Sequence, residues 1–233
     1  MNREELNSNL LKQNIKVDDK TIDLLFSYMD YTLETNEKFN LTAITNREEF
    51  VEKMIFDSAL VLSNNDLTNK KVIDIGTGAG YPGMVLRILE PKADLFLLDS
   101  TKKKIDFINV FALANKLNIN PIVDRAESYS RQHTEEFDIV LARAVAPLNI
   151  LLEITTPLLK VGGEFLALKG ANYQEEIDQS KKALAKLNME ITNIEEFELP
   201  ESKEKRVIIH IKKNKTTNKK YPRDYSEIKK QPL

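Results

Sequence analysis

A carboxylate and a run of glycines lie together in residues 72–83. Residues 72–75 are apolar except for Asp74, which predicts a buried strand, and this strand runs directly into the turn Gly76-Thr77-Gly78-Ala79-Gly80. Glycines adopt positive φ freely and let a ligand approach the backbone, and a helix that follows points free N–H groups at that ligand. The segment therefore predicts a binding site for a nucleotide-like ligand.

The position of the acidic residues distinguishes between two such ligands. The register that begins at Gly78 matches the dinucleotide fingerprint, and Asp99 lies 19 residues after Gly80, where a carboxylate would bind a ribose. However, Asp74 would repel a pyrophosphate, and Gly76 begins Gly-x-Gly-x-Gly, which is a different spacing. A cationic ligand without phosphate fits better: S-adenosylmethionine could place its amino group on Asp74 and its ribose on Asp99. A purely structural role for Asp74, as a cap of the turn, stays open.

Charged residues also follow other predicted strands, at the edge where open α/β sheets bind ligands. Glu127 follows the third predicted strand, and Arg143 ends the fourth. An unpaired arginine at a buried edge is costly, which favours a functional role for Arg143. Arg125 and Lys169 end adjacent strands on the same edge, where each could instead pair with a neighbouring carboxylate.

The composition argues against several kinds of catalytic and metal site. The sequence has no cysteine and only two histidines, His133 and His210, so disulfides, thiolate zinc sites and hydrolytic triads are not expected. His133 lies in a polar stretch typical of a surface loop, and His210 alternates within the last predicted strand, which indicates a structural role. We therefore expect no metal site, although the composition leaves open a magnesium site made of carboxylates alone.

Strands and helices alternate from residue 71 onward, which predicts an α/β fold with a doubly wound, mostly parallel seven-stranded sheet. The predicted strands are 71–75, 94–98, 119–123, 137–142, 164–169, 190–198 and 206–211. The predicted helices between them are 82–89, 103–117, 148–159 and 174–187, and two amphipathic helices, 18–37 and 47–62, precede the sheet. Only a short turn separates the last two strands, which predicts an antiparallel C-terminal hairpin. We expect an N-terminal helical extension (1–66) packed on the core, a catalytic domain (67–213) and a basic tail (214–233).

The composition is that of a soluble protein, with 233 residues of which 42% are hydrophobic and 30% charged, and a mean hydropathy of −0.37. No apolar run approaches the roughly 20 residues that span a bilayer, so we expect a cytoplasmic protein without membrane contact, and a monomer. The net charge of −2 is uneven: residues 201–233 sum to +7 and the first 200 residues to −9. The basic segment predicts contacts with nucleic-acid phosphates, or is only a solvated tail.

Motifs along nearly the whole chain carry a family resemblance. Residues 74–83 with Leu97-Leu98-Asp99-Ser100 resemble the cofactor motifs of class I S-adenosylmethionine-dependent methyltransferases. More specific matches are Phe39-Asn40-Leu41-Thr42-Ala43, Asp57-Ser58, Asp124-Arg125-Ala126-Glu127, Ala142-Arg143-Ala144-Val145-Ala146, Ala167-Leu168-Lys169-Gly170 and Lys220-Tyr221-Pro222-Arg223. This set, from about Asn40 to Arg223, resembles the glucose-inhibited division protein B family, the small-subunit ribosomal RNA guanine-N7 methyltransferases.

The resemblance implies a reaction and a set of site residues. The reaction is methyl transfer from S-adenosylmethionine to N7 of a guanine in the 530 loop of 16S ribosomal RNA, either naked or in the small ribosomal subunit. The residues implied for cofactor binding are Asp74, Gly76, Gly78, Gly80, Tyr81, Asp99, Ser100, Ala126, Glu127 and Arg143. Gly76 and Tyr81 would line the methionine side, Ala126 and Glu127 would meet the adenine, and Arg143 would lie between the cofactor and the substrate. One position departs from the family pattern, because Met54 stands where the family usually has a histidine.

The acceptor's chemistry needs no general base, because N7 of guanine carries a lone pair and no proton. Catalysis would come from holding N7 in line with the methyl group and the sulfur. Arginine is the side chain best suited to guanine O6, so Arg143 and Arg125 are the first catalytic candidates, with Lys169 as the third. Two other functions stay open: a small-molecule methyltransferase with the same cofactor site, and a non-catalytic RNA-binding protein with the same fold.

Overall fold

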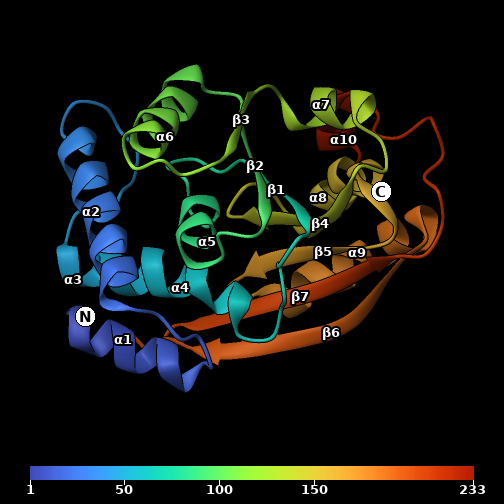
Figure 1. The fold of residues 1–233 in the computed structure, drawn as a ribbon. Coiled ribbons are helices and arrows are strands. Elements are labelled where there is room, and N and C mark those ends of the chain that lie inside the picture. Colours follow the sequence, from blue (N-terminus) through green and yellow to red (C-terminus); the bar gives the residue numbers. More distant parts are fainter.

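A twisted seven-stranded sheet forms the centre of the computed structural model, which describes all 233 residues (Figure 1). The strand order is β3-β2-β1-β4-β5-β7-β6. The strands are β1 (Lys71–Ile75), β2 (Asp94–Asp99), β3 (Asn120–Val123), β4 (Phe137–Arg143), β5 (Leu159–Lys169), β6 (Met189–Glu198) and β7 (Lys205–Lys213). The first five are parallel, and β7 pairs antiparallel with both β5 and β6. This order confirms the predicted class I methyltransferase fold and its antiparallel C-terminal hairpin.

Helices cover both faces of the sheet and bury two separate apolar cores. On one face lie α5 (Gly83–Leu89) and α6 (Lys102–Ala114), and on the other α7 (Ala126–Gln132), α8 (Leu148–Thr155) and α9 (Tyr173–Leu187). Along β1, Val72 belongs to the first core and Ile73 to the second, so both faces of this strand are buried. Fully burying each such side chain contributes about 1.5–3 kcal/mol, and the residues of β1 after Lys71 are accordingly apolar except for Asp74.

The N-terminal helices belong to the first core. They are α1 (Arg3–Lys12), α2 (Asp19–Asn36) and a continuous helical stretch composed of α3 (Arg47–Phe50), the π-helical turn η1 (Val51–Phe56), α4 (Asp57–Ala59) and the 3₁₀ turn η2 (Leu60–Leu62). Their buried side chains pack with those of α5 and α6. The two predicted N-terminal helices are confirmed, whereas α1 and α7 were not predicted.

The segment after β7 is not a free tail. Tyr221 and Leu233 are 8% exposed, and Ile228 on α10 (Tyr225–Lys230) is fully buried. Arg223 donates to the fully buried carboxylate of Glu153 through its Nε and Nη2 atoms, at 2.8 and 2.7 Å. The predicted tail over 214–233 therefore packs on α8, because apolar residues and a buried ion pair hold its second half.

Two further differences concern the ends of β5 and β7. β5 begins at Leu159 rather than at residue 164, with Gly162 at φ +87° next to the irregular pairing of β4 with β5. Lys213 at the end of β7 is fully buried and donates from Nζ to the carbonyls of Thr156 and Leu159, so it is not available to a phosphate. No helix has the length and apolar character needed to cross a membrane.

Candidate cofactor and substrate pocket

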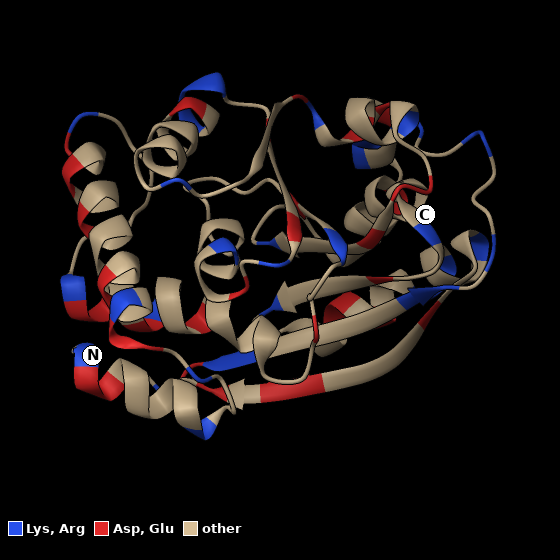
Figure 2. Ribbon diagram, in the orientation of Figure 1, with Lys and Arg blue, Asp and Glu red and all other residues tan.

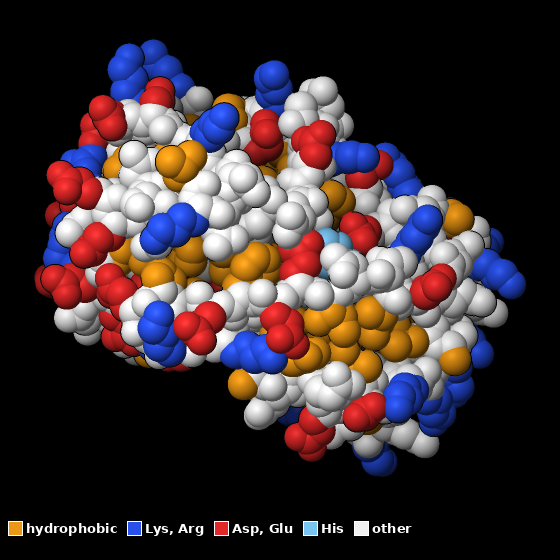
Figure 3. All heavy atoms as spheres, turned by 90° about the horizontal axis from the view of Figure 1, so that it is seen from below, with side chains coloured by type: hydrophobic (Ala, Val, Ile, Leu, Met, Phe, Trp, Pro, Cys, Tyr) orange, Lys and Arg blue, Asp and Glu red, His pale blue; other side chains and the backbone are white.

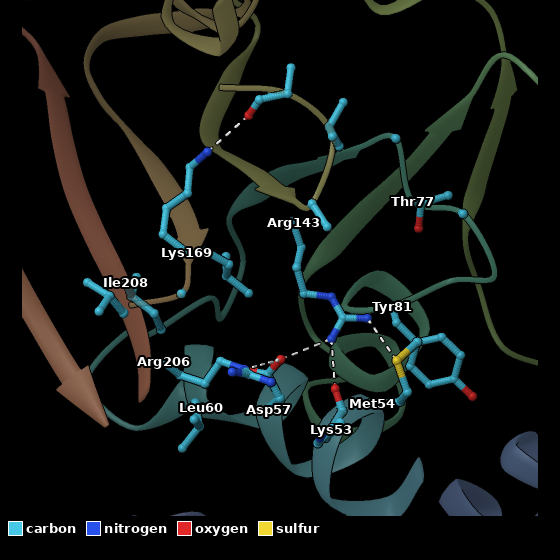
Figure 4. Close-up of a pocket in the computed structure, with 18 of the residues that line it drawn as sticks. Lys53, Met54, Asp57, Leu60, Thr77, Tyr81, Arg143, Lys169, Arg206 and Ile208 are labelled. Carbon is cyan, nitrogen blue, oxygen red and sulfur yellow. Dashed lines mark hydrogen bonds and ion pairs between the residues drawn. The ribbon is translucent and has the colours of Figure 1, made fainter. Parts of the chain in front are cut away.

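A cavity with a volume of about 1010 Å³, called the main cavity below, opens at the carboxyl ends of β1, β4 and β5. It lies where the strand order reverses between β1 and β4, the position at which doubly wound sheets bind ligands. The turn after β1, the ends of β4 and β5, the helical stretch 53–60 and the start of β7 line it (Figure 4). This volume is at the upper end of the range for small-molecule sites, so it has room for more than one ligand group.

The glycine turn forms one wall of the cavity. Gly76, Gly78 and Gly80 all have positive φ, at +67°, +60° and +81°. A Cβ on Gly78 would meet nothing closer than 3.9 Å, so the space above this residue is open to a ligand. A Cβ on Gly80 would lie 2.3 Å from the hydroxyl of Tyr28, so this glycine is required for packing against α2.

Asp74 lies behind the turn, fully buried, and does not line the cavity. Its Oδ2 accepts hydrogen bonds from Thr77 Oγ1 at 2.7 Å and from the backbone N–H of Gly83 at 2.9 Å, so the carboxylate does cap the turn and α5. Its Oδ1 has no partner. Burial raises the pKa of Asp74 to about 6. A cationic group in the cavity would therefore stabilise this carboxylate, which fits the ammonium and sulfonium groups of S-adenosylmethionine.

Asp99 at the end of β2 also contacts the turn. Its Oδ2 accepts from the backbone N–H of Gly78 at 3.1 Å, and its Oδ1 accepts from that of Thr101 at 2.8 Å. Lys104, which lines the cavity, lies 3.9 Å from the same carboxylate. Asp99 is thus hydrogen-bonded to the turn at Gly78, where the space is open to a ligand. Ser100, which was also predicted for the cofactor site, is exposed.

Tyr81 lines the cavity but is held by the N-terminal helices. Its hydroxyl lies 3.1 Å from Thr32 Oγ1 on α2, and its ring packs against those of Tyr28 and Phe50. Burial raises the pKa of Tyr81, so its phenol stays protonated. Tyr81 therefore presents an apolar edge to the cavity rather than an ionisable group.

Arg143 at the end of β4 points across the cavity toward the helical stretch 53–60 (Figure 4). Its Nη1 donates to the carbonyl of Lys53 and to Asp57 Oδ2, both at 3.1 Å, and its Nη2 donates to the sulfur of Met54 at 3.3 Å. Met54, the departure from the family pattern, thus contacts the candidate catalytic arginine.

Arg206 is a cavity residue that the sequence analysis missed. Its Nε lies 3.2 Å from Asp57 Oδ2, so Asp57 holds Arg143 and Arg206 together. One available signal was topological: β7 runs antiparallel, so its first residues, rather than its last, meet the carboxyl edge of the parallel strands.

Of the other two predicted catalytic residues, Lys169 and Arg125, only Lys169 lies at the cavity. Lys169 lines the cavity and donates from Nζ to Glu176 at 2.7 Å and to the carbonyl of Ala146 at 3.0 Å. Arg125 does not line the cavity: its Nε donates to Glu127 at 2.9 Å and its guanidinium lies over the ring of Tyr225. The structure therefore places Arg143 and Lys169, but not Arg125, at the cavity.

The predicted adenine contacts lie next to Arg125. Glu127 is 9% exposed and Ala126 is half-buried, and neither lines the main cavity. Their place in the cofactor site stays a prediction.

Neither histidine reaches the cavity. His133 stacks on Tyr129 with ring centroids 4.0 Å apart, near the surface. His210 is buried between Glu164 and Glu195, with its ring nitrogens 3.3 and 2.9 Å from their carboxylates, and the hydrogen bond to Glu164 raises its pKa. The predicted surface position of His133 and the predicted structural position of His210 within the last strand agree with this placement.

Comparisons with known proteins agree with the fold and show the family. The GidB family model, described as rRNA small subunit methyltransferase G, matches residues 21–208. The ribosomal RNA small subunit methyltransferase G of Caldicellulosiruptor bescii is 47% identical over 217 residues, which are 90% of this chain and 91% of that protein. The protein of the same name from Desulfitobacterium hafniense is 43% identical over 99% of this chain and 98% of its own length. In fold, the chain is similar to M. jannaschii TYW2 in complex with AdoMet, with a TM-score of 0.57 and 16% identity over 73% of this chain and 79% of that one. By the family model and these two relatives, the chain belongs to the GidB family of small-subunit ribosomal RNA methyltransferases G.

Proposed function

We propose that this protein transfers a methyl group from S-adenosylmethionine to N7 of a guanine in the 530 loop of 16S ribosomal RNA. The observation that carries the proposal is one cavity in which the open position above Gly78 and the side chains of Arg143 and Lys169 meet. The family to which the chain belongs supports ribosomal RNA as the acceptor.

The cofactor end of the cavity is the glycine turn. The open space at Gly78 would let the cofactor approach the backbone of the turn closely. The buried carboxylate of Asp74 would favour the positive charge of the cofactor from behind the turn. Asp99, held in place by the N–H of Gly78, would accept hydrogen bonds from the ribose hydroxyls of the cofactor. When bound there, S-adenosylmethionine supplies a methyl group that its sulfonium activates for transfer.

The acceptor end is Arg143 and its neighbours. An arginine has five N–H donors, and three of those of Arg143 are engaged by Lys53, Asp57 and Met54. The remaining two are available for guanine O6, the acceptor that distinguishes guanine from adenine beside N7. Because Asp57 and the Lys53 carbonyl fix the guanidinium beforehand, little side-chain entropy is lost when the base binds.

No proton transfer is assigned to the protein. N7 of guanine carries no proton, and the residues lining the cavity include no histidine. The contribution of the protein is then to align N7 with the methyl group and to keep water out. The proposal takes the acceptor to be 16S ribosomal RNA, naked or within the small subunit, and the protein to act as a cytoplasmic monomer.

The test uses purified protein, transcribed 16S ribosomal RNA and S-adenosylmethionine with a labelled methyl group. We expect the label in N7-methylguanosine after digestion of the RNA, and binding of the cofactor in the micromolar range, roughly −8 kcal/mol. NAD should bind far more weakly. Label in another nucleoside, transfer only to a small metabolite, or RNA binding without any transfer would each contradict the proposal.

Gly78→Val serves as the control variant in the same assay. A branched side chain would occupy the open ligand position and would be strained at φ +60°, so both cofactor binding and methyl transfer should be lost.

A further inference from the structure

A second cavity lies at the other end of β7. Its volume is about 720 Å³, and it is lined by Lys186, Leu187, Asn188, Thr216, Thr217, Asn218, Lys219, Lys220 and Tyr221. The main cavity meets β7 at residues 206–208, whereas the second cavity begins beyond Lys213, where β7 ends. At about 3.3 Å per residue, the two cavities are separated by roughly 20 Å along the strand.

The walls of this second cavity are fixed by hydrogen bonds and burial. The N–H of Asn214 donates to the carbonyl of Asn188 at 2.9 Å, which ties the segment after β7 to the end of α9. The N–H of Tyr221 donates to the carbonyl of Asn218 at 2.9 Å, and the side chain of Tyr221 is buried in the second core. The cavity is therefore a feature of the packed chain and not of a loose tail.

The second cavity is lined by lysines whose charge no nearby carboxylate neutralises. Lys186, Lys219 and Lys220 line it, and none has a carboxylate within 4.0 Å, whereas nearby Lys181 and Lys213 are paired with Asp178 and Glu135. No acidic residue lines the cavity. The unpaired ammonium groups therefore favour an anionic ligand.

The surroundings strengthen this charge. Lys182, one helical turn before Lys186, and Lys215, next to Thr216 in the chain, are exposed. Figures 2 and 3 show Lys and Arg gathered at the right-hand end of the molecule, where Figure 1 places the segment after β7. The C-terminal end of α9 would by itself repel an anion. However, the N–H of Asn188 bonds to the carbonyls of Leu184 and Ala185, which caps that end.

We propose that this cavity and its lysines bind the phosphate backbone of ribosomal RNA, at a distance from the guanine in the main cavity. The inference rests on the proposed function, which supplies RNA as the partner. Tyr221 is 8% exposed and cannot serve as a stacking platform for a base, so the contact is to phosphates and independent of base sequence.

Such a site would act on affinity and not on the chemical step. A second contact on the same RNA raises the effective concentration of the acceptor loop at the main cavity without changing the alignment of N7. An RNA too short to reach both cavities would gain nothing from it.

The experiment compares two triple variants of the full-length protein with equal charge change. Lys186→Gln/Lys219→Gln/Lys220→Gln removes the lysines of the cavity, and Lys12→Gln/Lys16→Gln/Lys20→Gln removes exposed lysines of the N-terminal region. Binding to transcribed 16S ribosomal RNA is measured across a salt series, together with KM and kcat on this RNA and on a short hairpin that contains only the acceptor loop.

For the cavity triple we expect a loss of at least tenfold in affinity for 16S ribosomal RNA. The slope of the logarithm of the binding constant against the logarithm of the salt concentration should be smaller in magnitude by about 2, since each of three phosphate contacts contributes about 0.7 on single strands. KM on the long RNA should rise with kcat unchanged, the short hairpin should be methylated as by the wild type, and cofactor affinity should not change. The N-terminal triple should behave as the wild type.

Two results would overturn the inference while leaving the proposed function in place. One is a cavity triple with the affinity and slope of the wild type, and the other is an equal loss in both triples. In a further control, inorganic phosphate is added to the RNA-bound wild type at constant ionic strength. If it abolishes the contribution of these lysines to RNA binding, the cavity is a site for small anions and not for RNA, and the inference is again overturned. A wild type that neither binds nor methylates the RNA would overturn the proposed function itself.

Discussion

Asp57 holds two arginines of the main cavity in place. Its Oδ2 contacts Arg143 Nη1 at 3.1 Å and Arg206 Nε at 3.2 Å, with the carboxylate itself only 10% exposed. A buried carboxylate that holds two guanidinium groups fixes both of them, and each would be costly to leave unpaired. The main cavity therefore contains an arginine that is already fixed in place, rather than a flexible one.

Arg143→Ala should lower kcat/KM for methyl transfer by at least tenfold, about 1.4 kcal/mol of transition-state stabilisation, with an unchanged circular dichroism spectrum. Arg125→Ala is the matched control, because Arg125 lies outside the cavity, and its kcat should stay near that of the wild type. Steady-state kinetics of both variants shows which of the two arginines contributes to methyl transfer. Wild-type turnover by Arg143→Ala would remove Arg143 from the site.

Asp74 gives the cofactor site a pH dependence. Burial raises its pKa from 3.8 to about 6, so between those pH values the folded chain holds a proton that the unfolded chain releases. The contribution of Asp74 to stability therefore falls as the pH rises through this window. A bound cation favours the ionised form, so the affinity for S-adenosylmethionine should fall as the pH drops below about 6.

Calorimetry of cofactor binding between about pH 5 and pH 8 tests this dependence. Asp74→Asn keeps an oxygen that can accept from Thr77 and Gly83 but carries no charge, so its affinity should be lower at neutral pH and should not change across the same range. An equally steep fall in Asp74→Asn would assign the titration to another group.

At the scale of elements, α2 positions the glycine turn. Tyr28 donates from its hydroxyl to the carbonyl of Ala79 at 2.7 Å, and Thr32, one helical turn later, contacts the hydroxyl of Tyr81 at 3.1 Å. Both side chains of α2 are buried. The N-terminal extension therefore supports the glycine turn of the proposed cofactor site.

Tyr28→Phe should weaken binding of S-adenosylmethionine several-fold, because the carbonyl of Ala79 loses its only side-chain partner and the turn loosens. Leaving that carbonyl unpaired costs about 1–3 kcal/mol, so the unfolding temperature should also fall by a few degrees. Tyr31→Phe is the control on the same helix, since its hydroxyl contacts Phe107 and not the turn. Cofactor affinities that are equal in the two variants would contradict the assignment.

The sequence predicted those elements whose pattern is local. The apolar periodicity of 18–37 and 47–62 and the alternation from residue 71 onward were sufficient for the sheet, its hairpin and most helices. It did not predict α1, which is mostly polar, the seven-residue α7, or α10, which lies within the basic segment. The site was predicted where a residue follows a strand, but the contact of Arg206 with Asp57 joins residues 149 positions apart, which no spacing rule reaches.

At the scale of the whole molecule, the C-terminal segment closes the second core. Glu153 on α8 is fully buried and accepts three hydrogen bonds from Arg223, one from the backbone and two from the guanidinium. Deleting residues 214–233 would leave this carboxylate unpaired and would expose the surface that Tyr221 and Leu233 cover. Truncation is therefore not a clean way to test the charge of this segment, and point variants are required.

Arg223→Ala should lower the free energy of unfolding by about 3–5 kcal/mol, because it leaves a buried charge without its partner. Adding Glu153→Gln to Arg223→Ala should recover part of this loss, since a neutral amide is less costly to bury than a carboxylate. Denaturant unfolding of the two variants and the wild type measures both effects. A single variant as stable as the wild type would show that the ion pair does not hold the segment.

The most direct test of the whole account is to map N7-methylguanine in the small-subunit ribosomal RNA of cells with and without this protein. We predict one methylated guanine in the 530 loop that is lost without the protein and restored by the wild type, but not by Gly78→Val. An identical methylation pattern in both kinds of cell would contradict the assignment of this cavity to a ribosomal RNA methyltransferase, and so would a lost methyl group on another atom or outside that loop.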